Sequence, residues 1–300
     1  MRPSALLTAD WHIRSSTPKC RTDNFLKAQE CKVDFVVELA KKYDCPILIA
    51  GDIGDKDQWS NELLEWFTQI LIDVNVIAIP GQHDLPDHSL KEIKRSGTGV
   101  LTASETIDVR DSTYVTIEND FNLISFPFSK PLRHFKINRE SGDYPKVAMT
   151  HQMIVKNAPL WKGQKDPKSR QILRRYPEYN LILSGDNHNA FRVKYKGRLL
   201  VNPGSLMRTN AAQVNHRPRV YLWYAKTNTV KPIYIPIKDG VISREHIEEK
   251  DEQKERMGTY VERMKADYDL SISFEDNLER RIKLDKVRKK VERKIWENVK

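Results

Sequence analysis

Five short polar blocks, each placed directly after a run of apolar residues, constrain this chain more than any other feature of its sequence. Runs of three or four β-branched or Leu-rich residues bounded by polar residues predict buried strands. In α/β folds the chemistry is found where such strands end. The runs are Ala5–Leu7, Ile47–Ala50, Val76–Ile79, Val147–Met149 and Leu181–Leu183, and the blocks that follow them are Asp10-Trp11-His12, Gly51-Asp52, Gly81-Gln82-His83-Asp84, His151 and Gly185-Asp186-Asn187-His188.

The residues from 4 to about 205 alternate between strand-like runs and amphipathic segments, which predicts an α/β fold with helices covering a sheet. One helix is expected from Asp23 to Tyr43, and a second is expected after Ser60, whose side chain can cap it. The strand-like runs 114–117 and 122–126 indicate a second sheet region packed on the first. Later runs read as the closing strands, so the predicted architecture is a two-sheet β-sandwich flanked by helices. These later runs are 191–195, 199–201, 220–224 and 231–235.

The sequence becomes charged and helix-forming after Gly240, which predicts a domain of residues 1–240 and a charged helical C-terminal extension of residues 241–300. Ser273 and Asp276 have the spacing of a helix-capping box, and apolar residues then recur at helical spacing from Leu278 to Val299. Lys and Arg residues fill the opposite side. A terminal helix packed on its own domain, a docking helix for a partner and a basic arm that contacts phosphates all remain open.

Composition limits the class of protein. The 300 residues include 51 Lys and Arg against 41 Asp and Glu, a net charge of +10 that favours a polyanionic partner such as DNA, although a solvated basic surface is the alternative. Apolar runs are too short for a membrane span and the N-terminus lacks a signal-type segment, so we expect a cytoplasmic protein without membrane association. Cys20, Cys31 and Cys45 have no C-x-x-C spacing and are expected to be reduced.

The polar blocks carry the ligand types of a site for two metal ions. Asp10 and His12 are one residue apart, so in an extended segment both side chains would project to the same side and bind one ion. Asp52 follows a glycine that permits a tight turn, and its two carboxylate oxygens can bridge two cations. Gln82 adds an amide oxygen, and the neighbouring His83 can donate a proton if no metal binds it.

The order of these blocks resembles the pattern of the calcineurin-like metallophosphoesterase superfamily, which reads D-x-H, G-D, G-N-H-[DE], H and G-H-x-H. The resemblance implies a β-sandwich with two metal ions at one end, usually manganese, with magnesium as the alternative. It also implies that His83 protonates the leaving oxygen and that Asp84 orients His83. The implied ligands are Asp10, His12, Asp52 and His188 for the first metal, and Asp52, Gln82, His151 and Asp186 for the second.

Two residues depart from the superfamily pattern. Gln82 stands where Asn is usual, so the amide oxygen is kept on a side chain longer by one methylene. Asp186 stands where His is usual and would make the site harder, which favours manganese or magnesium over softer ions. Both departures concern the second metal, and they affect its occupancy more than the fold.

Within the superfamily the chain is most similar to SbcD-type DNA repair nucleases. The similarity rests on Asp10-Trp11-His12, on Pro80–Pro86 followed by His88 and Gly99-Val100-Leu101, and on Val201-Asn202-Pro203-Gly204-Ser205. It implies a manganese-dependent DNA nuclease that works with an SbcC-type ATPase subunit, for which the C-terminal helices are the candidate contact; a homodimer is a further option. A phosphatase or cyclic-nucleotide phosphodiesterase, and a metal-poor protein-binding module, are the alternative functions.

DNA would require contacts outside the metal site. Trp59 and Trp161 could stack on bases, although a packing role is the simpler expectation for both. Basic side chains are expected to hold flanking phosphates, with a solvated surface as their alternative. The candidates are Lys130, Arg133, Lys136, Lys165, Lys168, Arg170, Arg174 and Arg175.

Overall fold

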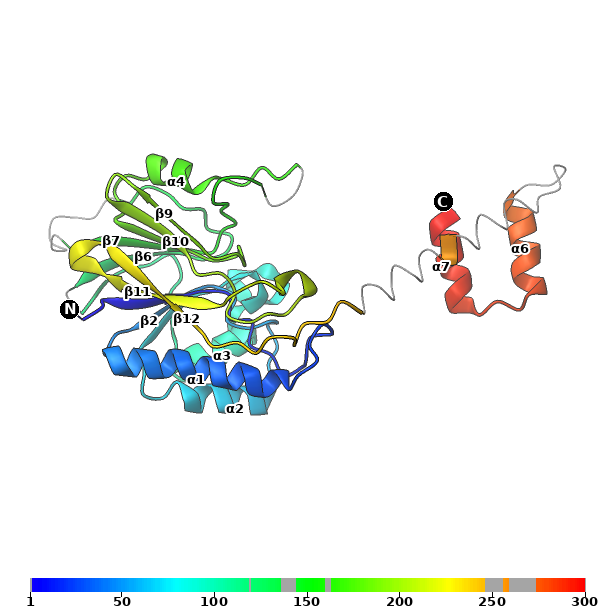
Figure 1. Cartoon of the computed structure of the whole chain (residues 1–300), viewed down its shortest axis with the longest axis horizontal. Helices are drawn as coiled ribbons and strands as arrows, with labels where there is room; N and C mark the ends of the chain where they lie inside the picture. Colours follow the sequence, from blue (N-terminus) through cyan, green and yellow to red (C-terminus); the bar gives the residue numbers. More distant parts are fainter. Residues whose placement is uncertain are drawn as a thin grey trace. The chain divides into compact units, whose positions relative to one another are not determined.

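The computed structural model describes residues 2–118, 120–135, 144–159, 163–245, 256–258 and 274–299. The chain divides into two compact units, Met1–Ile242 and Ser243–Lys300 (Figure 1). Each unit is described by itself. Lys136, Trp161 and the capping residue Ser273 lie outside the described residues.

The described residues of the first unit form two six-stranded sheets. In the first sheet, the strand order is β12-β11-β1-β2-β3-β4, with β1 to β4 parallel and β11 and β12 antiparallel. All residues of β1, β2 and β3 are buried, as expected for parallel strands covered on both faces. The strands are β1 (Ala5–Thr8), β2 (Ile47–Ala50), β3 (Val76–Ile79), β4 (Asp108–Val109), β11 (Arg219–Tyr224) and β12 (Thr229–Tyr234).

In the second sheet the order is β5-β6-β7-β8-β10-β9, with a parallel centre and antiparallel edge strands. The predicted strands at 114–117, 122–126, 191–195 and 199–201 all belong to this sheet. The strands are β5 (Tyr114–Ile117), β6 (Phe121–Phe126), β7 (Lys146–Thr150), β8 (Leu181–Ser184), β9 (Phe191–Tyr195) and β10 (Arg198–Asn202).

The two sheets pack face to face because neighbouring residues of each strand point to opposite sides. In β1, Leu7 joins the core between the sheets, whereas Leu6 joins the core under the helices. The first sheet is covered by α1 (Phe25–Tyr43), α2 (Asn61–Ile70) and α3 (Gly97–Ala103), and the second by α4 (Ser169–Arg175), as Figure 1 shows. The predicted two-sheet sandwich flanked by helices is confirmed.

Both predicted helices of the first unit are present, with small changes at their ends. Asn24 caps α1 by accepting from the Lys27 N–H, so the helix begins at Phe25 and not at Asp23. Ser60 caps α2 as predicted, accepting from the Leu63 N–H at 3.3 Å. Neither α3 nor α4 was predicted, because seven-residue helices carry too little periodicity to be recognised.

In residues 274–299 of the second unit, two helices are present where one continuous apolar stripe was predicted. α6 (Phe274–Leu284) ends and α7 (Lys289–Val299) begins around Lys286, whose φ is 47°. The Val287 N–H binds the Ile282 carbonyl and the Lys286 N–H binds the Lys283 carbonyl, which is a Schellman termination. Leu278, Ile282 and Ile295 then bury one another in a small core within this unit. Among the described residues, no helix combines the length and apolarity needed to cross a bilayer.

Candidate metal centre

The predicted site residues converge at one edge of the sandwich because the strands before them are parallel or nearly so. Asp10 follows β1, Asp52 follows β2, Gln82 follows β3, His151 follows β7 and Asp186 follows β8. The backbone leaves these strands sharply: φ is 50° at Asp10, 51° at Asp52 and 71° at Asp186. Non-glycine residues rarely adopt such conformations, and they concentrate at functional sites.

The first group of ligands comprises Asp10, His12 and His188, whose ligand atoms lie within 4.8 Å of one another. The Nε2 atoms of His12 and His188 are 3.1 Å apart. Asp10 and His12 do share one site, but the segment is not extended as predicted, since His12 also has a positive φ of 48°. Asp10 Oδ1 accepts from the Asp186 N–H at 3.0 Å, which ties the first block to the last.

The second group is centred on His151, whose ligand atom lies within 4.8 Å of those of Asp10 and Asp52. His151 Nδ1 donates to the Ala50 carbonyl at 2.7 Å, so Nε2 is the atom directed into the site. Nε2 lies 2.8 Å from Gln82 Oε1 and 3.3 Å from Asp52 Oδ2. Because both of those oxygens are acceptors, a positive charge is required between them, either a proton on Nε2 or a cation.

Asp186 is close to the second group through Gln82. The Gln82 side-chain amide donates to Asp186 Oδ1 at 3.2 Å, while its oxygen faces His151. Asp186 is half-buried and belongs to none of the metal-binding clusters found among the described residues. The two residues that depart from the superfamily pattern are therefore neighbours in space.

Two buried oxygens test whether these residues fit a metal. Within the described part of the chain, the fully buried Asp10 Oδ2 has no hydrogen-bond partner, and the fully buried Asp52 Oδ2 has only the charge of His151, 3.3 Å away, beside it. A buried carboxylate oxygen without a partner is costly, and a bound cation removes that cost. Carboxylate, imidazole and amide donors suit manganese or a similar divalent ion. The side chains present therefore fit a divalent metal centre.

In the metal-free protein, burial and neighbouring charges set the protonation of the clustered Asp and His side chains. Burial raises the pKa of Asp10 to about 8, and the neighbouring Asp52 carboxylate adds to this rise. Burial lowers the pKa of His12 to about 3, so its ring is neutral as ligation requires. Burial alone would lower the pKa of His151, but the charge and hydrogen bonding of Asp52, the charge of Asp10 and the bond to the Ala50 carbonyl together outweigh it, and the pKa is raised to about 10. A metal ion would replace that proton.

His83 and Asp84 do not interact in the way the superfamily resemblance implied. His83 is exposed, and its Nδ1 bonds to the Asp55 carbonyl at 3.0 Å. Asp84 is fully buried and accepts from the backbone N–H groups of Gly54 at 2.9 Å and Gly81 at 2.8 Å. Among the described residues, no hydrogen bond joins the Asp84 carboxylate to the His83 ring. Asp84 instead holds the loop whose Asp55 carbonyl orients the ring.

Two glycines permit the close packing of the centre. Gly51 has φ of 89°, and a Cβ there would overlap the ring of His151. A Cβ at Gly185 would overlap the Ala50 carbonyl and also meet His151. The glycines therefore allow the ends of β2 and β8 to enclose His151.

Several residues that support the centre were not predicted. The Leu206 N–H donates to the Asp10 carbonyl at 3.1 Å, and the Ser205 N–H donates to the His188 carbonyl at 3.2 Å. Thr98 donates to Asp84 at 3.3 Å. The motif Val201–Ser205 was recognised as a resemblance, but backbone contacts leave no residue-type signal from which this role could have been inferred.

Comparison with known proteins places this geometry in a family. The family model for calcineurin-like phosphoesterases matches residues 4–190. A solved protein of Thermus thermophilus is 12% identical, with a TM-score of 0.47 over 79% of this chain and 100% of that one. A solved archaeal phosphodiesterase is 13% identical, with a TM-score of 0.42 over 77% and 99%. The comparison with curated protein sequences gave no match.

A helix-flanked, two-sheet sandwich with Asp and His side chains gathered at one edge defines a metal-dependent phosphoesterase scaffold. The match over residues 4–190 covers more than half of the chain. The chain belongs to the calcineurin-like phosphoesterase family.

Proposed function

We propose that the protein is a manganese-dependent DNA nuclease of the SbcD type, which hydrolyses phosphodiesters with two bound metal ions. The observation that carries the proposal is the exposed His83 beside the buried ligand cluster. The ring centroids of His83 and His12 are 5.0 Å apart, so an acid stands at the rim of the site where a leaving group departs.

The residues divide the chemistry between them. Asp10, His12, Asp52 and His188 would hold the first metal, and Asp52, Gln82, His151 and Asp186 the second. When bound, the metals would neutralise charge that develops on the phosphoryl oxygens. His83 in its charged form donates from Nδ1 to the Asp55 carbonyl, which leaves the Nε2 proton for the departing sugar oxygen.

A basic surface at the far end of β9 supports DNA as the substrate. Tyr195 is surrounded by the guanidinium carbons of Arg170, Arg174 and Arg198 at 5.2 to 5.6 Å and by the ammonium nitrogen of Lys196 at 5.9 Å. No ion pair among the described residues links these cations to a carboxylate. We refer to Arg170, Arg174, Tyr195, Lys196 and Arg198 as the Tyr195 cluster.

The position of the Tyr195 cluster favours a polymer over a small phosphoester. β9 begins three residues after His188 and carries the chain away from the metal centre for about 15 Å. A ligand that contacts both places must span about four to five base steps of DNA. A cyclic nucleotide or a small phosphate monoester cannot do so.

Trp59 does not support the proposal. Its indole nitrogen donates to the Lys56 carbonyl at 3.0 Å, and its ring packs against Phe67 with centroids 5.3 Å apart. Trp59 therefore has the packing role that was the simpler expectation.

An SbcC-type ATPase is the proposed partner, and unit Ser243–Lys300 is its proposed contact. Leu284 is 69% exposed and Val291 is 38% exposed, so part of the apolar stripe stays outside the small core of α6 and α7. Exposed apolar side chains on an amphipathic helix pair are a common basis of docking. A second copy of the chain is the alternative occupant, and a cytoplasmic location is part of the proposal.

The proposal is tested by digesting end-labelled single- and double-stranded DNA with the full chain in manganese, with a nitrophenyl phosphodiester assayed alongside. Cleavage of DNA that is lost in His83→Ala supports a nuclease and reveals its polarity. Hydrolysis of the small ester without DNA cleavage, also after addition of an ATPase partner, would favour a phosphatase or cyclic-nucleotide phosphodiesterase. Inactivity on both substrates together with absent metal binding would favour a metal-poor binding module.

The DNA surface has its own test. Arg170→Gln combined with Arg174→Gln should weaken DNA binding. The plot of the logarithm of the association constant against the logarithm of salt concentration should become less steep, by about two. Lys226→Gln combined with Lys231→Gln removes the same charge from the β11–β12 hairpin and should leave that slope nearly unchanged. Equal effects of the two pairs would show that only net charge matters.

A further inference from the structure

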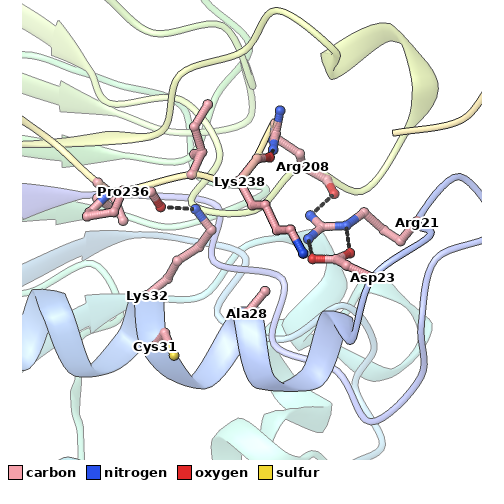
Figure 2. Close-up of a pocket in the computed structure, with 10 residues that line it drawn as sticks. Arg21, Asp23, Ala28, Cys31, Lys32, Arg208, Pro236 and Lys238 are labelled. Atoms are coloured by element: carbon pink, nitrogen blue, oxygen red, sulfur yellow. Dashed lines mark hydrogen bonds and ion pairs between the residues drawn. The ribbon is translucent and has the colours of Figure 1, made fainter. Parts of the chain in front are cut away.

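A pocket lined by several charged side chains lies outside the metal centre in unit Met1–Ile242. Its volume is about 350 Å³, and none of its residues is a proposed metal ligand. Figure 2 shows Lys32 extending from α1 toward Pro236, with Arg21, Arg208 and Lys238 gathered beside it. The complete lining is Arg21, Asp23, Ala28, Cys31, Lys32, Arg208, Ile235, Pro236, Ile237 and Lys238.

Three of the cations that line this pocket are more than nine-tenths buried. Arg208 is 3% exposed, Lys32 is 5% exposed and Arg21 is 8% exposed. Arg21 has a carboxylate partner, because its guanidinium binds both oxygens of Asp23 at 2.8 and 2.7 Å. Buried Lys and Arg side chains without a carboxylate partner are rare in folded proteins.

The other two buried cations have only neutral partners. Lys32 Nζ donates to the Pro236 carbonyl at 3.2 Å. Arg208 Nη2 donates to the Lys238 carbonyl at 2.6 Å, and Arg208 Nε has no hydrogen-bond partner in the described part of the chain. Carbonyl dipoles compensate a buried charge only in part, so both cations retain the capacity to bind an anion.

The charges of the pocket do not balance. With the exposed Lys238, four cations line it against the single carboxylate of Asp23, and Asp239 approaches Arg208 from outside the lining. Burial, together with the charges of Arg208 and Arg21, lowers the pKa of Lys32 to about 8. A bound anion would offset both effects.

We propose that this pocket, the Lys32–Arg208 pocket, binds a small phosphate-bearing anion. The guanidinium fork suits phosphate oxygens, and the volume is at the lower end of small-molecule sites. The buried position of the cations favours a phosphate monoester such as a mononucleotide, or free phosphate, over the backbone of a DNA duplex. The inference is independent of the proposed nuclease activity.

The pocket is connected to the metal centre through its loops. Arg21 Nη1 donates to the Arg208 carbonyl at 3.2 Å, which joins the loop after His12 to the loop after β10. Arg208 is two residues from Leu206, whose N–H binds the Asp10 carbonyl at 3.1 Å. An anion that orders Arg21 and Arg208 therefore acts on the loop that supports Asp10.

The test is calorimetric titration of the full chain with inorganic phosphate and with a deoxynucleoside monophosphate. Excess chelator keeps the metal centre empty, so binding there does not contribute. The expected result is saturable binding of at least one ligand by the wild type, at least tenfold weaker in Lys32→Met and unchanged in Lys27→Met. Lys27 is on the same helix, and its side chain is 68% exposed, so the control removes the same charge outside the pocket.

Each outcome decides the proposal. No binding of either ligand by the wild type, or equal binding by wild type and Lys32→Met, overturns it and leaves the cations as structural ties to backbone carbonyls. Binding of the nucleotide at much lower concentration than phosphate identifies a nucleotide site, whereas similar binding identifies a site for the phosphate group alone. If Lys32→Met does not fold, Lys238→Gln is used instead. Lys238 is exposed, and the proposal requires that its substitution weakens binding several-fold.

Discussion

Gln82 and Asp186, the two residues at which the centre departs from the superfamily pattern, are hydrogen-bonded to each other at 3.2 Å. Each therefore alters the surroundings of the other. The Gln82 side chain contacts His151 through its oxygen and Asp186 through its nitrogen. Under the proposed assignment, both residues would serve the second metal.

We expect the pair to be thermodynamically coupled. Gln82→Asn or Asp186→His alone should weaken manganese binding by about 10- to 100-fold, because each leaves the other without its partner. The double variant restores the usual superfamily pair and should lose less than the sum of the single changes, by about 1 kcal/mol or more. Calorimetric titration with manganese measures all four proteins. Strictly additive losses would contradict the coupling.

His83 should be needed for catalysis but not for metal binding. His83→Ala should lower phosphodiester hydrolysis by about 100- to 10,000-fold, because the leaving oxygen loses its acid. The affinity for manganese should change by less than about threefold, because a proton donor that is not a ligand leaves the metal's ligands in place. His134→Ala, an exposed histidine that binds Glu178, serves as the control. A large loss of metal affinity would instead make His83 a ligand together with His12 and Asp52.

Asp84 should stabilise the loops that contain Gly54 and Gly81. Asp84→Asn places an amide where backbone N–H groups of Gly54 and Gly81 now donate, and should lower the free energy of unfolding by about 2–3 kcal/mol. Thr98→Val removes one donor to the same carboxylate and should cost about 1 kcal/mol. Urea denaturation of the metal-free proteins gives both values. An Asp84→Asn variant as stable as wild type would contradict this role.

The buried Lys32 should make stability depend on pH. Its pKa is about 8 in the folded protein against an ordinary value of 10.5, chiefly because of burial and then of Arg208 and Arg21, with Asp23 and Cys31 opposing. The folded state therefore binds fewer protons than the unfolded state between these values, and the contribution of Lys32 to stability rises as pH increases from 8 to 10.5.

Lys32→Met provides the measurement of this effect. Relative to the variant, the wild type should gain at most about 3 kcal/mol of unfolding free energy between about pH 7.5 and about pH 10.5. Urea denaturation at several pH values gives the unfolding free energy of both proteins. Subtracting the variant's value from that of the wild type removes the contribution of the other titrating groups. Lys27→Met, on the same helix, should show no such trend. A difference that is constant with pH would mean that the pKa of Lys32 is the same in the folded and unfolded states.

Gly51 should be required for the position of His151. Gly51→Ala both strains a residue at φ of 89° and drives a Cβ into the His151 ring, so we expect a loss of about 3 kcal/mol or more together with weaker metal binding. Gly197→Ala separates the two effects, because Gly197 has φ of 79° but open space around it, and should cost about 1–2 kcal/mol. Equal costs in thermal denaturation would rule out the steric contribution.

Much of the first unit follows from local sequence pattern. Apolar runs such as Ile47–Ala50 and Val76–Ile79 form strands with the predicted bounds, since a strand buried on both faces needs a continuous apolar run. The break between α6 and α7 was missed because a left-handed Lys286 has no signature in residue type. Helical spacing continues across the break, so periodicity alone predicts one stripe.

The sequence by itself determined which side chains could form the metal centre, because polar residues that follow parallel strands come together at one edge whatever the loops do. Only the tertiary structure decided which atoms meet. It paired Gln82 with Asp186, and it directed Asp84 to backbone N–H groups and away from the His83 ring. It also buried Lys32 beside Arg208, which come from separate segments. Hydrogen-bond partners and buried charges depend on non-local packing, and no local pattern encodes them.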